Sequence, residues 1–147
     1  MLEMKNITKV YRTEHVETHA LSDLNVKVES GAFVAVMGPS GSGKTTFLNT
    51  AGLLDTFDGG TYNLDGLDVS RLKDRQMSRI RNEKIGFIFQ TFNLIPDLSL
   101  FDNIDVPLRY RGLPAAARRR AIEEALEIVG LSSRLKHLPA QLSGGQQ

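Results

Sequence analysis

The 147-residue sequence contains no cysteine and no tryptophan, and its formal net charge is only +1. The absence of cysteine excludes disulfide bonds and thiolate metal sites. Eighteen Lys and Arg residues face seventeen Asp and Glu residues, so the composition gives no overall attraction to nucleic acid or to an acidic membrane surface. A partner of either kind would have to be recognised locally, and we expect no nucleic acid among the partners.

Long apolar runs are also lacking. No run approaches the roughly 18 residues of a membrane span, and the first residues, MLEMKNITKVYR, lack the apolar core of a secretory signal peptide. Hydrophobic residues nevertheless make up 41% of the sequence, which is enough for the core of one domain. We therefore expect a globular domain that reaches a membrane only through a partner.

The apolar patterns predict two kinds of strand. Apolar residues alternate with polar ones at residues 2–5 and 24–28, as in half-buried antiparallel strands, and a short strand is expected at 61–64. Residues 32–37, AFVAVM, and 84–90, KIGFIFQ, are continuously apolar or nearly so. Such runs are typical of parallel strands buried on both faces.

Helical patterns follow the glycines and dominate the second half. Apolar residues recur at helical spacing from Phe47 to Leu54, and Ser70 is a candidate cap for a polar helix running to about Asn82. Two further helices are expected at residues 100–110 and 114–129, the second with Pro at its first turn and a glycine as its stop. The order predicts a small antiparallel sheet, an α/β core and a helical segment from about residue 91.

Residues 38–45, GPSGSGKT, which we call the glycine loop, match the pattern G-x-x-x-x-G-K-[ST] at every fixed position. Glycines allow the backbone to curl so that successive N–H groups face phosphate oxygens, and the following helix presents its positive end to them. Lys44 would neutralise the β and γ oxygens, and the Thr45 hydroxyl would bind Mg²⁺. The nucleotide-binding residues predicted here are Gly38, Pro39, Ser40, Gly41, Ser42, Gly43, Lys44, Thr45 and Thr46.

A second glycine motif, LSGGQ at residues 142–146, lies far along the chain from the glycine loop. Together with GPSGSGKTT, with FQ at residues 89–90 and with Tyr11, it resembles the nucleotide-binding subunit of ABC transporters. The likeness extends over the whole chain and is greatest for the subgroup of lipoprotein-releasing, macrolide-export and cell-division ATPases, through GLLDTFDGG, IGFIFQTFNLIPDLS, VPLRYRG and LSGGQQ. The resemblance implies an α/β P-loop NTPase fold of the ABC ATPase type, with an N-terminal antiparallel β subdomain and a helical subdomain.

The same resemblance implies roles for single residues. Tyr11 matches the aromatic residue that stacks on adenine, and Gln90 matches the glutamine that reaches Mg²⁺ and the attacking water. Ser143, Gly144, Gly145 and Gln146 match the signature loop, which caps the γ-phosphate of ATP held by a second subunit. ATP and Mg²⁺ are thus the implied ligands, Thr45 and Gln90 the implied metal contacts, and a homodimer the implied working state.

The partners implied by the resemblance are integral membrane permease subunits. The segment after Gln90, residues 91–110, would receive a helix of the permease, and its apolar residues suit a docking groove as well as core packing. The implied location is cytoplasmic, peripheral on the cytoplasmic face of the inner membrane. The transported substrate would be selected by the permease.

Family members follow the signature helix with an apolar strand that ends in Asp and Glu, the Glu activating the attacking water. Residues 1–147 contain no such strand: Asp55 lies at a helix terminus, and Glu123 and Glu124 belong to a charged helix face beside arginines. We therefore expect a partial ABC ATP-binding domain, with residues 1–90 forming the β subdomain and P-loop core and 91–147 the helical subdomain. We expect it to bind ATP without hydrolysing it, to expose apolar surface and to be marginally stable.

Two alternatives remain open on the sequence. A soluble ABC-type ATPase of DNA repair or translation would share both glycine motifs, although such proteins usually carry long insertions between the segments that match Gln90 and the signature. The other alternative is a nucleotide-binding module without catalysis. We expect this description to apply to residues 1–147 taken by themselves.

Overall fold

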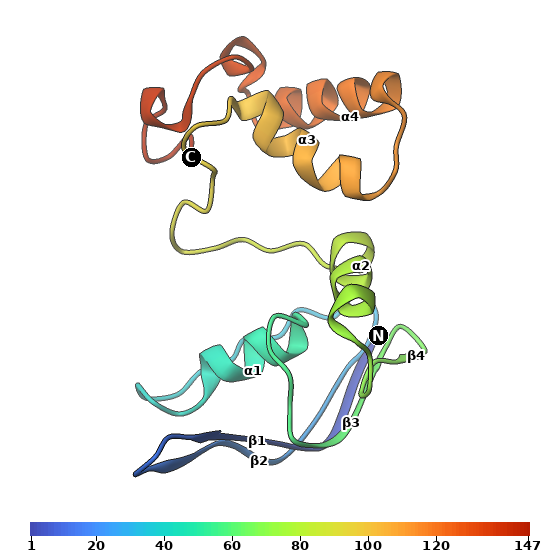
Figure 1. The fold of residues 1–147 in the computed structure, drawn as a ribbon, viewed down its shortest axis with the longest axis vertical. Helices are drawn as coiled ribbons and strands as arrows, with labels where there is room; N and C mark the ends of the chain where they lie inside the picture. Colours follow the sequence, from blue (N-terminus) through green and yellow to red (C-terminus); the bar gives the residue numbers. More distant parts are fainter. The chain divides into compact units, whose positions relative to one another are not determined.

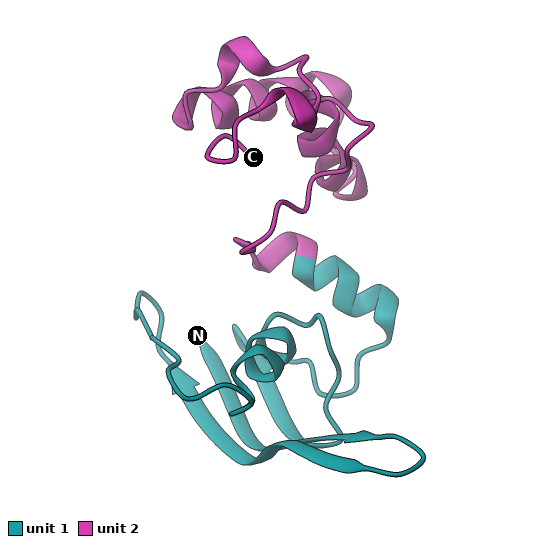
Figure 2. Ribbon diagram, turned by 90° about the vertical axis from the view of Figure 1, so that its left-hand side faces the viewer, with its two compact units in different colours: residues 1–81 teal, residues 82–147 magenta.

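The computed structural model describes residues 1–147 and divides them into two compact units, residues 1–81 and 82–147 (Figure 2). The first unit holds β1 (Leu2–Arg12), β2 (Glu17–Val28), α1 (Lys44–Ala51), β3 (Gly59–Leu64), β4 (Leu67–Asp68) and most of α2 (Asp74–Lys84). The second holds α3 (Leu100–Tyr110), α4 (Ala115–Ile128) and the short 3₁₀ helices η1 (Ser132–Arg134) and η2 (Pro139–Gln141). Figure 1 labels the main elements.

The four strands form one antiparallel sheet in the order β2-β1-β3-β4. This sheet confirms the antiparallel strands predicted at residues 2–5 and 24–28 and the short strand predicted at 61–64. A tight turn, with the Thr13 amide donating to the Val16 carbonyl at 2.9 Å, joins β1 to β2. Met4, Ile7 and Tyr62 project from β1 and β3 and are buried, so they form the core under the sheet. Figure 1 shows α1 lying over one face of this sheet.

Residues 32–37 do not form the buried parallel strand that their composition predicts. They follow β2 as a segment without strand pairing, and Phe33 and Met37 are 96% and 87% exposed. The physical reason is that a parallel strand needs hydrogen-bonded neighbours and cover on both faces. No other segment of residues 1–147 pairs with this one, so the apolar surface expected from the sequence is exposed.

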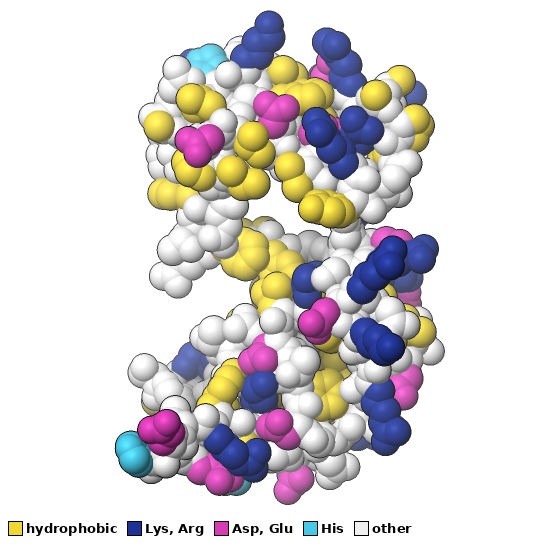
Figure 3. Space-filling view, viewed as in Figure 1, with side chains coloured by type: hydrophobic (Ala, Val, Ile, Leu, Met, Phe, Trp, Pro, Cys, Tyr) yellow, Lys and Arg dark blue, Asp and Glu magenta, His cyan; other side chains and the backbone are white.

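The strand predicted at residues 84–90 is wrong for the same reason. Lys84 is the last residue of α2, and the residues after it run without strand pairing, with Ile88 fully exposed. Here the rings of Phe87 and Phe89 stack on each other at 5.4 Å between centroids. Figure 3 shows hydrophobic side chains, in yellow, on the surface of the molecule.

The cap predicted for α2 is also wrong. The helix begins at Asp74, and the Ser70 hydroxyl instead donates to the Asp68 carboxylate at 2.6 Å and accepts from the Tyr62 amide at 2.8 Å. Ser70 therefore closes the turn that follows β4. The start of α2 is supported by Gln76, whose side-chain oxygen accepts from the Lys73 amide at 3.0 Å.

In the second unit α3 and α4 pack on a small apolar core, as their periodicity predicts. This core consists of Leu100, Ile122, Leu126 and Leu142, all buried. Ser99 caps α3 by accepting from the Asp102 amide at 3.1 Å. The Pro114 and Gly130 boundaries predicted for α4 are confirmed, since Pro114 precedes its first residue and Gly130 follows with φ +71°.

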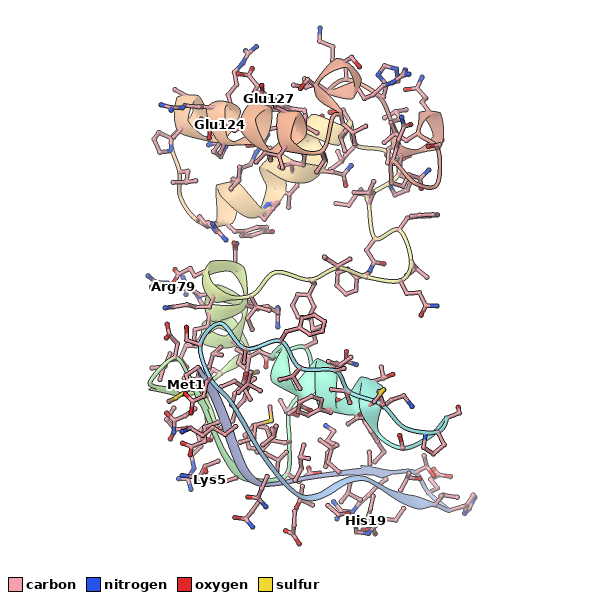
Figure 4. All side chains as sticks on the ribbon, turned by 180° about the vertical axis from the view of Figure 1, so that it is seen from behind. Met1, Lys5, His19, Arg79, Glu124 and Glu127 are labelled. Carbon is pink, nitrogen blue, oxygen red and sulfur yellow. The ribbon has the colours of Figure 1, made fainter.

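A buried carboxylate joins the two helices. Asp105 in α3 accepts from Arg109 Nε at 2.5 Å and from Arg118 Nε of α4 at 2.6 Å. Glu123 and Glu124 pair with Arg119 and Arg120 one turn away on the exposed face of α4. This is the charged face that the sequence predicts. Figure 4 labels Glu124 on this helix.

The first compact unit ends at Arg81, whereas the sequence predicts a subdomain boundary after Gln90. The subdomain boundary after Gln90 stays a prediction. No helix combines the length and the apolar character that crossing a membrane requires.

Candidate functional site

The glycine loop connects the exposed segment 32–37 to α1 and depends on glycine at its last turn. Gly43 has φ +83°, and a Cβ placed there would lie 2.4 Å from the Ala20 carbonyl oxygen of β2. Neither the backbone conformation nor the space suits a larger residue. The loop thus passes against the sheet and enters α1 at Lys44.

Lys44 spans the loop with its side chain. Its ammonium donates to the carbonyl oxygens of Gly38 at 2.9 Å and Pro39 at 2.6 Å, and it lies 3.4 Å from Ser42 Oγ. These contacts hold a cation at the first residue of α1, whose first turn contains no acidic side chain. Positive charge from the ammonium and from the helix N-terminus therefore gathers at one place, as an anion-binding site requires.

The two threonines after Lys44 face different surroundings. Thr45 is exposed in the first turn of α1, while Thr46 is half-buried and interacts with the Tyr11 hydroxyl of β1. No group of three or more His, Cys, Asp or Glu side chains is placed to hold a metal ion. A Mg²⁺ ion here would take its ligands from hydroxyl and phosphate oxygens, so Thr45 fits the donor set of a nucleotide-bound Mg²⁺ ion.

Tyr11, which the sequence singles out, belongs to a cluster with Lys9 and Asp55. The Tyr11 hydroxyl donates to Asp55 Oδ2 at 2.7 Å, and the Lys9 ammonium donates to Asp55 Oδ1 at 2.8 Å. The same ammonium lies 5.1 Å from the centre of the Tyr11 ring. Lys9 is buried while Tyr11 remains 42% exposed, so Tyr11 is anchored at its hydroxyl and keeps part of its surface accessible.

The ammonium of Lys9 and the carboxylate of Asp55 form an ion pair at 2.8 Å. Burial raises the pKa of the Asp55 carboxyl, but the hydrogen bonds from Lys9 and Tyr11 outweigh burial and leave that pKa below its ordinary value. The bond to Asp55 is the main cause of a raised pKa of the Tyr11 hydroxyl. At neutral pH Asp55 is therefore a charged acceptor for Lys9 and Tyr11, and Tyr11 keeps its proton.

Sequence reasoning missed Lys9 and Asp55 as neighbours of Tyr11. A signal for Lys9 existed, because it occupies a core-facing position two residues after Ile7 on β1, and a buried lysine requires a partner carboxylate. No local pattern points from Lys9 to Asp55, which lies 46 residues away in sequence.

The signature segment, residues 142–146, forms a tight turn in the second unit. Leu142 anchors it in the apolar core, and the Ser143 amide donates to Gln146 Oε1 at 3.0 Å while the Ser143 carbonyl accepts from the Gln146 amide at 2.8 Å. Gln147 braces the turn by donating to the carbonyls of Pro139 and Leu142. Ser143, Gly144 and Gly145 are exposed, so this turn is accessible to another molecule.

The remaining predicted residue, Gln90, is exposed in the irregular segment after α2. The structure brings together the glycine loop, Thr46 and Tyr11 within the first unit, and it places Gln90 and the signature turn in the second. The nucleotide and metal roles of these residues stay predictions.

Comparisons with known proteins give one family. The family model described as ABC transporter matches residues 21–147. An uncharacterised ABC transporter ATP-binding protein of Thermotoga maritima is 44% identical over all of this chain, which covers 63% of that relative. The macrolide export ATP-binding/permease protein MacB of Brucella abortus is 42% identical over all of this chain, which covers 23% of it.

Among solved structures, the ATP-binding cassette MJ0796, described as a dimeric post-hydrolysis state bound to ADP and Pi, matches with a TM-score of 0.88 and 40% identity. MJ0796 belongs to Methanocaldococcus jannaschii, and the match covers 99% of this chain and 65% of that one. The likeness confirms the predicted P-loop ABC ATPase fold. The chain spans just under two thirds of the length of the Thermotoga relative, and it belongs to the ABC transporter family.

Proposed function

We propose that this chain is the ATP-binding part of an ABC transport system, with MgATP held on residues 38–46. The observation that carries the proposal is the position of Lys44: its ammonium lies across the glycine loop at the positive end of α1. Membership of the ABC transporter family supports the choice of a nucleoside triphosphate over other anions.

The glycine loop supplies three kinds of group to a triphosphate. Its backbone N–H groups surround the β-phosphate, and the Lys44 ammonium exchanges its carbonyl contacts for β and γ oxygens. The exposed Thr45 hydroxyl would be a ligand for Mg²⁺, which would neutralise phosphate charge when bound. Tyr11 would stack on adenine through its exposed ring, and Gln90 is the residue that would act on the attacking water and Mg²⁺.

Two copies act together in this proposal. The exposed backbone of Ser143, Gly144 and Gly145 contacts the γ-phosphate of ATP held by the glycine loop of the other copy. ATP then bridges the copies, and hydrolysis removes the group that both contact. The description of the similar cassette MJ0796 as dimeric and bound to ADP and Pi supports this arrangement.

The complete protein, in this proposal, hydrolyses ATP to drive a membrane permease that exports lipoproteins, macrolides or peptides. The name of the MacB relative, which joins an ATP-binding part to a permease, supports such a coupling. The permease would contact the segment 91–110, where Phe92 and Ile95 are exposed. The protein would work on the cytoplasmic face of the inner membrane.

Residues 1–147 by themselves are proposed to bind ATP without turning it over. Asp55, Glu123 and Glu124 are engaged elsewhere: Asp55 accepts from Lys9 and Tyr11, and the two glutamates pair with arginines of α4. A base in the reaction must reach the attacking water. Steady phosphate release by the purified 147-residue chain would contradict this part of the proposal.

Self-association tests the function as a whole. We expect MgATP to convert the chain from monomer to dimer in sedimentation velocity, and MgADP not to do so, because only the γ-phosphate is shared. Ser143→Arg should abolish dimer formation while it preserves binding of MgATP, and Lys44→Ala should abolish both. A dimer that forms equally well without nucleotide, or that survives Ser143→Arg, would contradict the shared site.

A further inference from the structure

We propose that Asp55 is a positioning residue for nucleotide binding, which orients Tyr11 for the base by holding its hydroxyl, with Lys9 as the counter-ion that keeps the carboxylate in place. The inference rests on the proposed function, since it takes adenine as the partner of Tyr11. It adds two residues that neither the sequence motifs nor the phosphate site assign.

The geometry of the carboxylate carries the first step. Each oxygen of Asp55 has its own donor, with Lys9 Nζ at 2.8 Å from Oδ1 and the Tyr11 hydroxyl at 2.7 Å from Oδ2. The Asp55 oxygen Oδ1 also accepts from the Thr56 amide at 2.8 Å. A carboxylate fixed by three donors leaves the Tyr11 hydroxyl one well-defined acceptor, so the ring loses the freedom to rotate away.

Lys9 and Tyr11 differ in how far they are buried. The Lys9 side chain is only 10% exposed and lies over the Tyr11 ring, whereas Tyr11 as a whole is 42% exposed. Lys9 covers part of the Tyr11 ring, and a planar base would stack on the part of Tyr11 that stays exposed. Pre-orienting an exposed aromatic ring lowers the entropy lost when a ligand stacks on it.

The connection to the glycine-loop helix carries the third step. Thr46 of α1 interacts with the same Tyr11 hydroxyl. Asp55 follows α1 closely, and its amide donates to the Asn49 carbonyl of that helix at 3.3 Å. One helix thus positions Lys44 at its first residue and the anchor of Tyr11 just beyond its last, which couples the phosphate and base ends of one ligand.

A comparison of two probes tests the inference on the purified chain, with binding measured by calorimetry. Asp55→Ala should weaken MgATP binding about tenfold, the factor that corresponds to 1.4 kcal/mol, and leave the affinity for magnesium tripolyphosphate, which lacks a base, unchanged. Tyr11→Phe should have the same effect, because it keeps the ring and removes only the hydroxyl. In the double variant the two losses should not add, since both remove one interaction.

Asp58→Ala is the matched control. Its carboxylate accepts from the Val10 amide at 2.7 Å and so braces the same strand without contacting Tyr11; we expect it to leave both affinities unchanged. Equal losses for MgATP and tripolyphosphate, additive losses in the double variant, or unchanged MgATP affinity in Asp55→Ala would overturn the inference. Absence of MgATP binding by the unaltered chain would overturn the proposed function, and the inference with it.

Discussion

The hydroxyl of Tyr62 in β3 donates a hydrogen bond of 2.7 Å to the carbonyl oxygen of Ala51, the last residue of α1. The Tyr62 side chain is completely buried. The carbonyls at the C-terminal end of a helix have no partner within the helix, so this bond satisfies one of them and ties the glycine-loop helix to the sheet. The position of Lys44 at the other end of α1 thus depends on a residue outside the site.

Replacing Tyr62 by Phe should destabilise the chain by about 1–2 kcal/mol, because the Ala51 carbonyl loses its buried donor. Urea denaturation followed by circular dichroism measures this loss. Tyr110→Phe is the control, since Tyr110 is largely exposed and its replacement should leave the unfolding midpoint unchanged. An equal effect of the two substitutions would contradict the role given to the Tyr62 bond.

The same residue predicts a dependence of stability on alkaline pH. Burial raises the pKa of Tyr62 from 10.0 to about 12. A group whose pKa is raised in the folded state contributes stability that is present below its unfolded pKa and is lost as pH rises through the folded one. The unfolding free energy should therefore fall between pH 10 and 12 more steeply in the unaltered chain than in Tyr62→Phe, as measured by urea denaturation across that range.

Gly43→Ala should impair both folding and nucleotide binding. The added methyl group would lie 2.4 Å from the Ala20 carbonyl oxygen, at a φ of +83° that alanine adopts reluctantly. Gly41→Ala separates backbone strain from steric clash, because Gly41 has φ +80° but no atom lies within 4 Å of the added Cβ. We expect Gly41→Ala to cost about 1–2 kcal/mol from backbone strain alone and Gly43→Ala to cost clearly more in denaturant unfolding.

Asp105→Ala should lower the melting temperature by several degrees. It leaves the partly buried Arg118 without the carboxylate that joins α3 to α4, and removing one partner of a buried ion pair is strongly destabilising. Glu123→Ala removes an exposed pair on α4 and should change the melting temperature little. Differential scanning calorimetry distinguishes these outcomes, and similar melting temperatures for the two variants would be evidence against a stabilising buried pair.

The pKa of Asp105 adds an acid-side prediction. The hydrogen bond from Arg109, together with that from Arg118, holds the pKa of this carboxyl below its ordinary value against the effect of burial. A depressed pKa gives stability that is present above the unfolded value and is lost as pH falls through the folded one. Acid unfolding should therefore be less pH-dependent in Asp105→Ala than in the unaltered chain below about pH 4.

The sequence predicts correctly those helices and strands that pair or pack with an element close to them along the chain. The alternation in β1 and β2 suffices because a short turn pairs the two strands, and the apolar spacing of α4 suffices because α3 lies adjacent in the chain. Residues 32–37 show the limit of such reasoning. Their apolar run favours a parallel strand, but a parallel strand is stabilised by partners far along the chain, and none pairs with it here.

One part of the candidate site could be predicted from the sequence and another part could not. The glycine loop could be recognised because phosphate binding demands fixed residue types at fixed spacing. The bond from Lys9 to Asp55 joins residues 46 positions apart, and neither residue is demanded by any local rule. Only the folded chain shows that the end of the α1 segment returns to β1 beside Tyr11.

Binding of MgATP by Lys44 is the central claim, and equilibrium dialysis with labelled ATP tests it most directly. We predict saturable binding by the unaltered chain and a loss of at least tenfold in affinity for Lys44→Ala. Lys27→Ala, which removes an exposed lysine paired with Glu29, should bind as the unaltered chain does. Binding that Lys44→Ala leaves unchanged, or that Lys27→Ala weakens equally, would contradict the account.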